Sequence, residues 1–337
     1  MKTLYAFTRR NVKLFFRDKG MFFTSLITPL ILLVLFFTFL GNVYRDTFLS
    51  FVPPGVRVPD TLIDGFVGGW LLSSLLAVCC VTVAFCSNMQ MVQDKVSGAE
   101  ADLAVTPVKR STLAVGYYLS AALTTLLICG VALCVGFLYL WNAGWYLSLS
   151  DVLLTVLDVF LLVMFGTALS SVINGFLSTQ GQISAVSSIV SSAYGFICGA
   201  YMPLSQFGTG LRTVISFLPG TYGTALIHNR LMRGVFETLE SDYLPAESVG
   251  LLREAFDGRL TLLGTEVTQP MMYLILCGCT ALLLAACYAA RTRGEKTKKM
   301  QAPGLLFVFG VGEEGLGNLK GARQICGDFG ARILAYY

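Results

Sequence analysis

Long apolar runs constrain this chain more than any other feature of its sequence. A helix needs about 20 apolar residues to cross the hydrocarbon core of a bilayer. Charged residues make up only 13% of the 337 residues and the mean hydropathy is +0.70, whereas soluble domains carry about 25% charged residues. The chain is therefore predicted to be an all-α integral membrane protein. The six predicted transmembrane helices cover residues 21–40, 66–89, 113–140, 152–173, 183–201 and 271–290.

Basic residues lie mainly on one side of these predicted spans. The segments 1–20, 91–112 and 291–299 together hold fourteen lysines and arginines, whereas the first loop on the other side holds Arg45 and Arg57. Short cytoplasmic segments are enriched in Lys and Arg, so both termini and the 91–112 loop are predicted to be cytoplasmic. The expected location is the cell membrane, of the bacterial inner-membrane type. Tryptophans near the predicted outer ends of spans agree with an aromatic belt: they are Trp70, Trp141 and Trp145.

Residues 1–20 are predicted to form an amphipathic helix. Apolar side chains, among them Phe7 and Phe15, fall on one half of a helical projection, and basic side chains fall in a narrow sector of the other half. Such a helix lies in the membrane interface, where it serves either as an anchor or as a lever joined to the first span. Its basic sector includes Arg9, Arg10, Lys13 and Arg17.

The stretch DKVSGAEADLAVTPVKRSTL separates the second and third predicted spans. Ser97 and Glu100 fit a capping box, Asp102 adds a favourable negative charge to the first helical turn, and Thr106-Pro107 ends the helix. A helix of about two turns is unstable alone in water, and its acidic residues disfavour the membrane surface. A cytoplasmic protein partner is therefore predicted. The alternative is a loop helix that packs on its own chain.

Two stretches resemble the permeases of ABC-2 type transporters. SGAEADLAVTPVKRSTLAVGYYLS resembles the first cytoplasmic loop of that family, in which an acidic residue, a short helix, TPV and the start of the third span recur in this arrangement. GAYMPLSQFGTGLRTVISFLPGTYGTALIHNRLMRGV resembles the family's outer segment, with a membrane-returning stretch and an LP-x-TY motif. With the N-terminal helix and the six-span layout, the resemblance covers roughly residues 1–295.

The resemblance implies a permease subunit of an ATP-binding cassette exporter. Two such subunits, as a homodimer or a heterodimer, would form the pathway. Two nucleotide-binding subunits would hold ATP and Mg²⁺, and this chain would bind no cofactor itself. A drug-like, antibiotic-like or lipid-like amphiphile is the expected cargo. The helix at 97–105 would dock on the nucleotide-binding subunit together with the interfacial helix. The implied contacts are Ser97, Glu100, Asp102, Leu103, Thr106 and Pro107.

Sequence motifs for catalysis do not occur in the chain. Without G-x-x-x-x-G-K-[ST], ATP hydrolysis is predicted to belong to another subunit. His228 is the only histidine and is expected to be a polar residue of the outer segment, and no nucleic-acid partner is predicted. The ten cysteines are expected to be small buried hydrophobes, not disulfides. An ion- or proton-coupled transporter or a membrane enzyme remains an alternative, although both usually carry several intramembrane charges.

Two features of the spans point to packing or to a transport pathway. Asp158 lies near the middle of the fourth predicted span, where a carboxylate is costly. The fifth span has small residues every three to four positions, which permit close helix packing or line a pathway for amphipathic cargo. The pathway candidates are Ser188, Ser192, Gly195 and Asp158.

Two further segments are predicted: an extracytoplasmic segment at 202–270 and a cytoplasmic tail at 291–337. Residues 202–234 are apolar but interrupted by proline and glycine, so they are expected to form short helices that return into the membrane. Residues 236–269 carry mixed charges and are expected to face water. The cytoplasmic tail is glycine-rich and aperiodic beyond residue 299, and is expected to be disordered.

Overall fold

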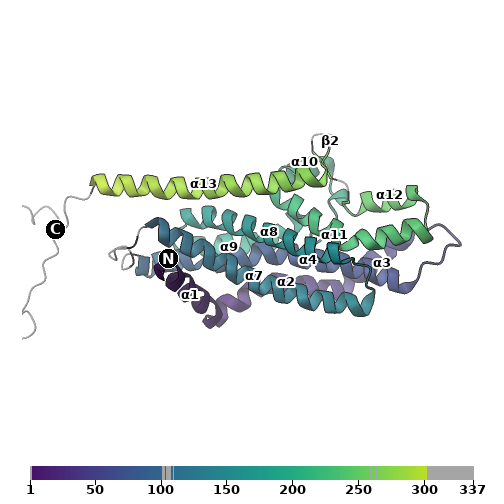
Figure 1. Cartoon of the computed structure of the whole chain (residues 1–337), viewed down its shortest axis with the longest axis horizontal. Coiled ribbons are helices and arrows are strands. Elements are labelled where there is room, and N and C mark those ends of the chain that lie inside the picture. Colours follow the sequence, from purple (N-terminus) through teal and green to yellow (C-terminus); the bar gives the residue numbers. More distant parts are fainter. Residues whose placement is uncertain are drawn as a thin grey trace, which may run out of the picture. The chain divides into compact units, whose positions relative to one another are not determined.

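The computed structural model describes residues 2–100, 103, 108, 110–258, 260–262 and 265–301. The chain divides into two compact units, Met1–Arg291 and Thr292–Tyr337. The described part of the second unit is the end of one helix, and the first unit contains everything discussed below. Figure 1 shows its long helices.

The elements follow in this order. The first half holds α1 (Lys2–Arg17), α2 (Lys19–Leu35), the π-helix η1 (Phe36–Leu40), α3 (Gly41–Ser50), α4 (Asp60–Asn88) and α5 (Gln90–Val96). The second half holds α7 (Arg110–Ala143), α8 (Leu149–Phe176), α9 (Gln180–Ile197), the 3₁₀ helix η2 (Leu204–Gln206), α10 (Thr209–Ser216), α11 (Pro219–Asp242), α12 (Ala246–Ala255), the antiparallel pair β1 (Thr261–Leu262) and β2 (Thr265–Glu266), and α13 (Gln269–Gln301).

Five helical stretches of the described chain are long and apolar enough to cross a membrane: Lys19–Ser50, Asp60–Val96, Ser111–Ala143, Leu149–Phe176 and Gln269–Ala289. The all-α membrane class is thereby confirmed. The fifth predicted span overlaps α9, which is helical but is not among the five, since Gln180, Gln182 and five serines lower the mean hydropathy of its 18 residues. The count of six spans therefore stays a prediction.

Helix α4 forms the centre of the first unit. It packs against α2, α7, α8, α9 and α11, and nearly all of its side chains are buried. Glycine permits several close approaches to α4. A Cβ at Gly166 of α8 would lie 2.8 Å from the carbonyl oxygen of Cys80 on α4, so any larger residue would push the two helices apart. Small residues let helices approach closely within lipid in this way.

The first span is one continuous helix that changes its winding. Helix α2 passes into α3 through the π-helical turn η1. Beyond that turn, Tyr44 and Phe48 of α3 are buried against Phe66 and Trp70 of α4. The Tyr44 hydroxyl also donates a hydrogen bond to the carbonyl oxygen of Tyr201 at 2.6 Å. The far end of the first span is thereby tied to the segment that follows α9.

Trp70 and His228 are both buried side chains. Trp70 is 1% exposed, so it is a core residue and not part of an aromatic belt. Its ring lies against that of His228, with centroids 4.1 Å apart, and Ser74 Oγ lies 3.4 Å from His228 Nε2. His228 thus lies in the outer segment as expected, but its ring is buried where α11, which carries it, packs against α4. Trp141 and Trp145 are exposed.

The segment 202–270 is more regular than its glycines and prolines predicted. Short elements do occur (η2 and α10), but α11 is an uninterrupted helix of 24 residues. Pro219 occupies its first turn, where a missing N–H costs nothing. Gly223 allows close packing, since a Cβ there would lie 2.6 Å from Leu162 Cδ1 on α8. The expectation that only short helices fill 202–234 is therefore wrong.

Candidate functional site

A buried carboxylate joins three helices beside the 97–109 loop. Asp94 of α5 accepts a hydrogen bond at 2.6 Å from the Tyr117 hydroxyl of α7 and one at 3.1 Å from Arg10 Nη1 of α1. The same arginine forms a salt bridge with this carboxylate. We call Arg10, Asp94 and Tyr117 the loop junction. The N-terminal helix is thereby fixed to both chain segments that flank the loop.

An apolar cluster lies beneath this polar contact. Phe7 packs edge-on against Tyr117 with ring centroids 4.9 Å apart, and Met91 and Leu113 complete the buried cluster. Leu103 and Val108, from the two sides of the loop, pack against it. Helix α1 comes so close to α7 that a Cβ at Gly116 would lie 2.4 Å from the Phe7 ring. Helices α1, α5 and α7 therefore form a packed base against which Leu103 and Val108 of the loop lie.

The capping box predicted at Ser97 is wrong. Ser97 is the C-terminal cap of α5, and Gly98 follows it with φ of +82°. A residue in that left-handed region cannot be the first helical residue after an N-cap. The Ser97 hydroxyl donates backwards to the Asp94 carbonyl oxygen at 3.4 Å. Ala99, the exposed Glu100 and Leu103 are helical; the other predicted contacts, Asp102, Thr106 and Pro107, lie outside the described residues.

The basic sector of α1 divides into two parts. Arg9, Lys13 and Arg17 are exposed, whereas Arg10 turns towards Asp94. The opposite side of α1 packs on α7. It buries two polar residues, Thr8 and Asn11, together with apolar ones. The buried side chains of α1 are Phe7, Thr8, Asn11 and Phe15.

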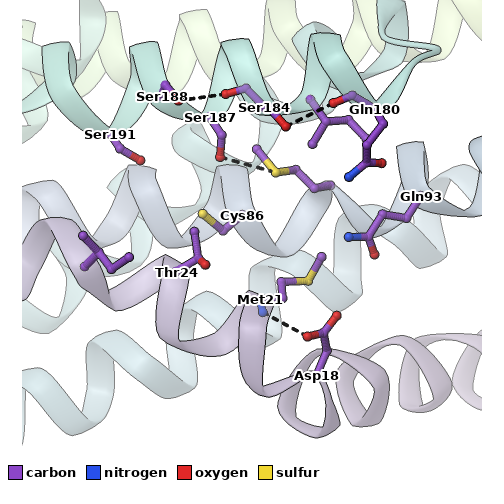
Figure 2. A pocket seen from close by; sticks show the side chains of 13 residues that line it. Asp18, Met21, Thr24, Cys86, Gln93, Gln180, Ser184, Ser187, Ser188 and Ser191 are labelled. Atoms are coloured by element: carbon purple, nitrogen blue, oxygen red, sulfur yellow. Dashed lines mark hydrogen bonds between the residues drawn. The ribbon is translucent and has the colours of Figure 1, made fainter.

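A cavity of about 480 Å³ lies between α2, the end of α4 with α5, and α9. Figure 2 shows side chains from these helices pointing into it. Aliphatic and thioether groups come from Met21, Ile27, Met89 and Ile183, and polar groups come mainly from α9. The full lining is Asp18, Met21, Thr24, Ile27, Cys86, Met89, Gln93, Gln180, Ile183, Ser184, Ser187, Ser188 and Ser191.

Several serine hydroxyls that face this cavity already donate hydrogen bonds within the protein. Ser184 donates to the carbonyl oxygen of Gln180 at 3.2 Å, and Ser188 donates to that of Ser184 at 2.9 Å (Figure 2). Ser187 donates to the Met89 sulfur at 3.6 Å. A hydroxyl that donates within its own helix retains only lone pairs for a ligand. This wall therefore presents mostly hydrogen-bond acceptors.

The four predicted pathway residues do not converge. Ser188 lines the cavity, while Ser192 is exposed further along α9 and donates to the Ser188 carbonyl oxygen at 2.7 Å. Gly195 is buried, and a Cβ there would lie 2.4 Å from the Tyr201 ring. It therefore serves packing. Asp158 lies on α8, which contributes nothing to this cavity.

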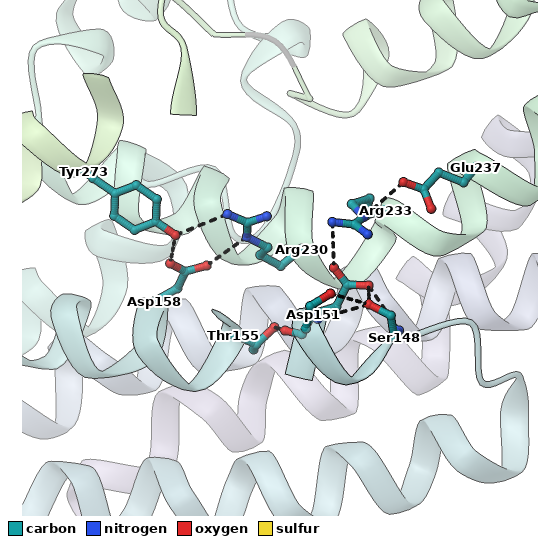
Figure 3. A network of polar contacts seen from close by, with 9 residues as sticks. Ser148, Asp151, Thr155, Asp158, Arg230, Arg233, Glu237 and Tyr273 are labelled. Carbon is teal, nitrogen blue, oxygen red and sulfur yellow. Dashed lines mark hydrogen bonds and ion pairs between the residues drawn. The ribbon is translucent and has the colours of Figure 1, made fainter. Parts of the chain in front are cut away.

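Asp158 belongs to a polar network between α8, α11 and α13 (Figure 3). Its carboxylate is fully buried, lies 3.8 Å from Arg230 Nε and accepts a hydrogen bond from the Tyr273 hydroxyl. The sequence alone does not show which residue pairs with Asp158. The overlooked signal was the pair of arginines in NRLMRGV, since a cation in an apolar helix also needs a partner. Within the described part of the chain, no group of three or more His, Cys, Asp or Glu residues could hold a metal ion.

Comparison with known proteins identifies the family. The sequence model described as ABC-2 type transporter matches residues 2–229. That range includes the interfacial helix, the loop junction, the cavity-lining helices and the start of α11. No curated protein and no solved structure matches the chain. Membrane subunits of this family are permease components that lack an ATPase site and work with ATP-binding subunits. The chain thus belongs to the ABC-2 type transporter family, as the multi-pass membrane permease of an ABC transporter.

Proposed function

We propose that this permease exports an uncharged or cationic amphiphile, and that the cavity between α2, α4 and α9 is where the cargo first binds. The single observation that supports this class is the acceptor-rich wall of Ser184, Ser187 and Ser188 beside two methionines. Ligand sites combine apolar contact area with a few placed polar groups. Here the serine oxygens accept hydrogen bonds and suit a cargo that carries N–H, O–H or ammonium groups, while the amides of Gln93 and Gln180 can also donate to it.

The charges around the cavity favour the same class. Among the described lining residues the only carboxylate is that of Asp18, whose Oδ1 caps α2 by accepting the Met21 amide at 3.0 Å. Neither lysine nor arginine occurs among the described lining residues. An anionic headgroup would therefore lose its hydration without gaining a cation, which is costly. A cation also loses hydration but can pair with the Asp18 carboxylate and the serine oxygens, and a neutral donor loses less hydration.

The predicted orientation indicates on which side of the membrane the cavity lies. Asp18, Gln93 and Gln180 line the cavity close to the ends of helices that adjoin the basic segments 1–20 and 91–112. Under the positive-inside rule this end faces the cytoplasm. We infer that cargo enters from the cytoplasmic side or the inner leaflet and leaves on the far side. The acting unit is a dimer of permeases with two ATPase subunits docked near the loop junction.

Reconstitution of the chain with its ATPase subunit in proteoliposomes tests this proposal. Rhodamine 6G, an amphipathic cation, should be transported when ATP is present, and the amphipathic anion anilinonaphthalene sulfonate should not. Ser188→Lys puts an ammonium group into the serine wall and should lower rhodamine transport about tenfold, since like charges repel strongly at low dielectric. Ser178→Lys, at an exposed position just before α9, is the matched control and should be silent.

Two outcomes would refute the proposal. Preferential transport of the anion would show that the cargo class is wrong. Transport by the chain without the ATPase, abolished by a protonophore, would favour the proton-coupled alternative.

A further inference from the structure

Two aspartates of α8 face two arginines of α11. Asp151 Oδ1 lies 3.4 Å from Arg233 Nη1, and Asp158 Oδ2 lies 3.8 Å from Arg230 Nε (Figure 3). We call Asp151–Arg233 the first rung, Asp158–Arg230 the second rung, and both together the ladder. The two carboxylates are 1% and 0% exposed. Removing either cation would therefore leave a charge where water cannot reach it.

Further hydrogen bonds hold the aspartate of each rung in place. Asp151 belongs to the capping box of α8, in which it accepts from Ser148 N at 3.1 Å and from Ser148 Oγ at 2.6 Å. Asp158 accepts from the Tyr273 hydroxyl of α13, which also lies 3.5 Å from Arg230 Nη2. The second rung therefore joins three helices. Neither carboxylate can follow a moving arginine without breaking these bonds.

The spacing of the rungs permits only one register. The aspartates are seven residues apart on α8 and the arginines three apart on α11, and the two helices are antiparallel because Asp151 meets Arg233 while Asp158 meets Arg230. At 1.5 Å per residue these separations are about 10.5 and 4.5 Å, so the arginines must splay apart to reach both carboxylates. A slide of α11 by one turn would bring one arginine nearer to its carboxylate and take the other out of reach.

Apolar packing between α8 and α11 supports the same register. A Cβ at Gly223 would meet Leu162, and one at Gly220 would lie 3.5 Å from the Phe165 ring. Gly223 thus makes room for Leu162 of α8. Phe165 is at ordinary contact distance from Gly220, whose nearest neighbour is the Tyr194 hydroxyl of α9. Close-packed surfaces of this kind have discrete arrangements and do not deform continuously.

We propose that the ladder is a register lock, which makes α8, α11 and the adjoining part of α13 move as one rigid body during transport. On this view the membrane-returning segment does not open as an independent gate. Motion occurs elsewhere, at the cavity between α2, α4 and α9, to which α8 and α11 contribute no side chain. The inference rests on the proposed function only in so far as it assumes a transport cycle.

A disulfide between α8 and α11 tests the register lock directly. A Cβ built at Gly223 lies 3.6 Å from Leu162 Cβ, which falls within the range of about 3.5–4.5 Å found in disulfides. Leu162→Cys/Gly223→Cys, in a chain without its native cysteines, should therefore oxidise readily with copper phenanthroline. ATP-driven rhodamine 6G transport by the reconstituted complex should stay within twofold of the reduced sample.

The matched control crosses the cavity. Thr24→Cys/Ser188→Cys, joined by a flexible bis-maleimide, should lower transport at least tenfold because α2 and α9 line opposite sides of the moving region. A disulfide at 162–223 that abolishes transport, with recovery under dithiothreitol, would overturn the proposal. Failure of that disulfide to form would also overturn it, since the packing it assumes would be absent.

Hydrogen exchange provides a readout that does not depend on cargo. In the purified complex, Arg230→Met should raise exchange at the α11 amides 226–230 at least tenfold and leave α9 unchanged. Asp158→Leu/Arg230→Met removes both charges and should restore protection to within threefold of the native chain. Unchanged exchange in the single variant would refute the lock even if the transport proposal held. Conversely, the wrong cargo class would leave this experiment valid.

Discussion

The loop junction and the ladder both use buried aspartates to join helices, but they differ in how far water can reach their cations. At the loop junction, Arg10 is 40% exposed and Asp94 has a neutral second donor in Tyr117. In the ladder, Arg233 of the first rung is 39% exposed, but Arg230 of the second rung is only 12% exposed. An exposed arginine can exchange a carboxylate for water at little cost, whereas a dehydrated one cannot. The comparison indicates that the loop junction can rearrange and that the second rung is what keeps the ladder rigid.

The largest effect should come from breaking the second rung. Arg230→Met leaves the Asp158 carboxylate fully buried with only Tyr273 as a partner. An uncompensated buried charge costs about 3–5 kcal/mol, so thermal unfolding in detergent should shift sharply downwards. Asp158→Leu/Arg230→Met should recover most of the loss, because replacing a whole buried pair by apolar groups is often neutral. A double variant as unstable as the single one would contradict this account.

A second prediction concerns pH in the segment 202–270. Asp257 is buried at φ of +56° and accepts the Ser205 amide at 3.0 Å and also the Leu204 amide. Burial raises the pKa of its carboxyl from 3.8 to about 7, and the two amide bonds and Arg212 oppose that shift. The protonated form is therefore the one that favours folding. Its contribution is complete below about pH 4 and is lost as the pH rises through about 7.

The melting temperature should accordingly fall between pH 4 and pH 8. Asp257→Asn cannot ionise and should flatten that part of the profile. Glu247→Gln, an exposed position on α12, is the control and should leave the slope as it is. A profile that rises with pH in the native chain, and loses that rise in Asp257→Asn, would mean that the amide bonds outweigh burial.

The loop junction should tolerate more than the ladder. In Asp94→Asn the amide oxygen can still accept the Tyr117 hydroxyl, and the half-exposed Arg10 can turn to water. The expected loss is about 1.5–3 kcal/mol, typical for a hydrogen bond to a charged group. The same change should speed tryptic cleavage after Arg10 because α1 detaches more often. Destabilisation equal to that of Arg230→Met would erase the distinction between the two regions.

The smallest effect on stability, within about 0.5 kcal/mol, is expected for Glu100→Arg. Glu100 is exposed beside the loop junction, and reversing its charge should weaken binding of the ATPase subunit and abolish substrate-stimulated ATP hydrolysis. Glu247→Arg carries the same reversal on α12 and should be nearly silent. Full coupling in Glu100→Arg together with its loss in Glu247→Arg would mean that the loop is not the docking element.

Hydropathy predicted the membrane class because burial of a span in lipid needs no knowledge of its neighbours. The N-terminal helix was predicted for a related reason, since its polar and apolar sides differ strongly. The capping box predicted at Ser97 was wrong because the pattern Ser-Gly-x-Glu can occur either at the start of a helix or just after the end of one. Gly98 held the deciding signal: a glycine just past a helix end commonly adopts positive φ, as it does here.

Contacts between distant segments explain the remaining misses. Asp94 was read as one of several loop charges, yet it is buried because Tyr117 and Arg10 converge on it in the fold. Asp158 had no visible partner because Arg230 lies on α11, a helix whose glycines predicted breaks. The cavity could not be anticipated either, because it depends on how α2, α4 and α9 pack and not on any one of them.

The π-helical turn η1 has a consequence for how this family tolerates changes in length. A π turn contains one residue more than the α turn it replaces, and each residue of an α-helix turns the chain by about 100°. Deleting one residue within Phe36–Leu40 would leave an ordinary helix with α3 rotated by that angle. The Tyr44 hydroxyl would then face away from the Tyr201 carbonyl oxygen, and Phe48 would leave Phe66. The contacts of Tyr44 and Phe48 therefore depend on the extra residue in this turn. Relatives that are one residue shorter here should also lack a tyrosine at the position of Tyr44.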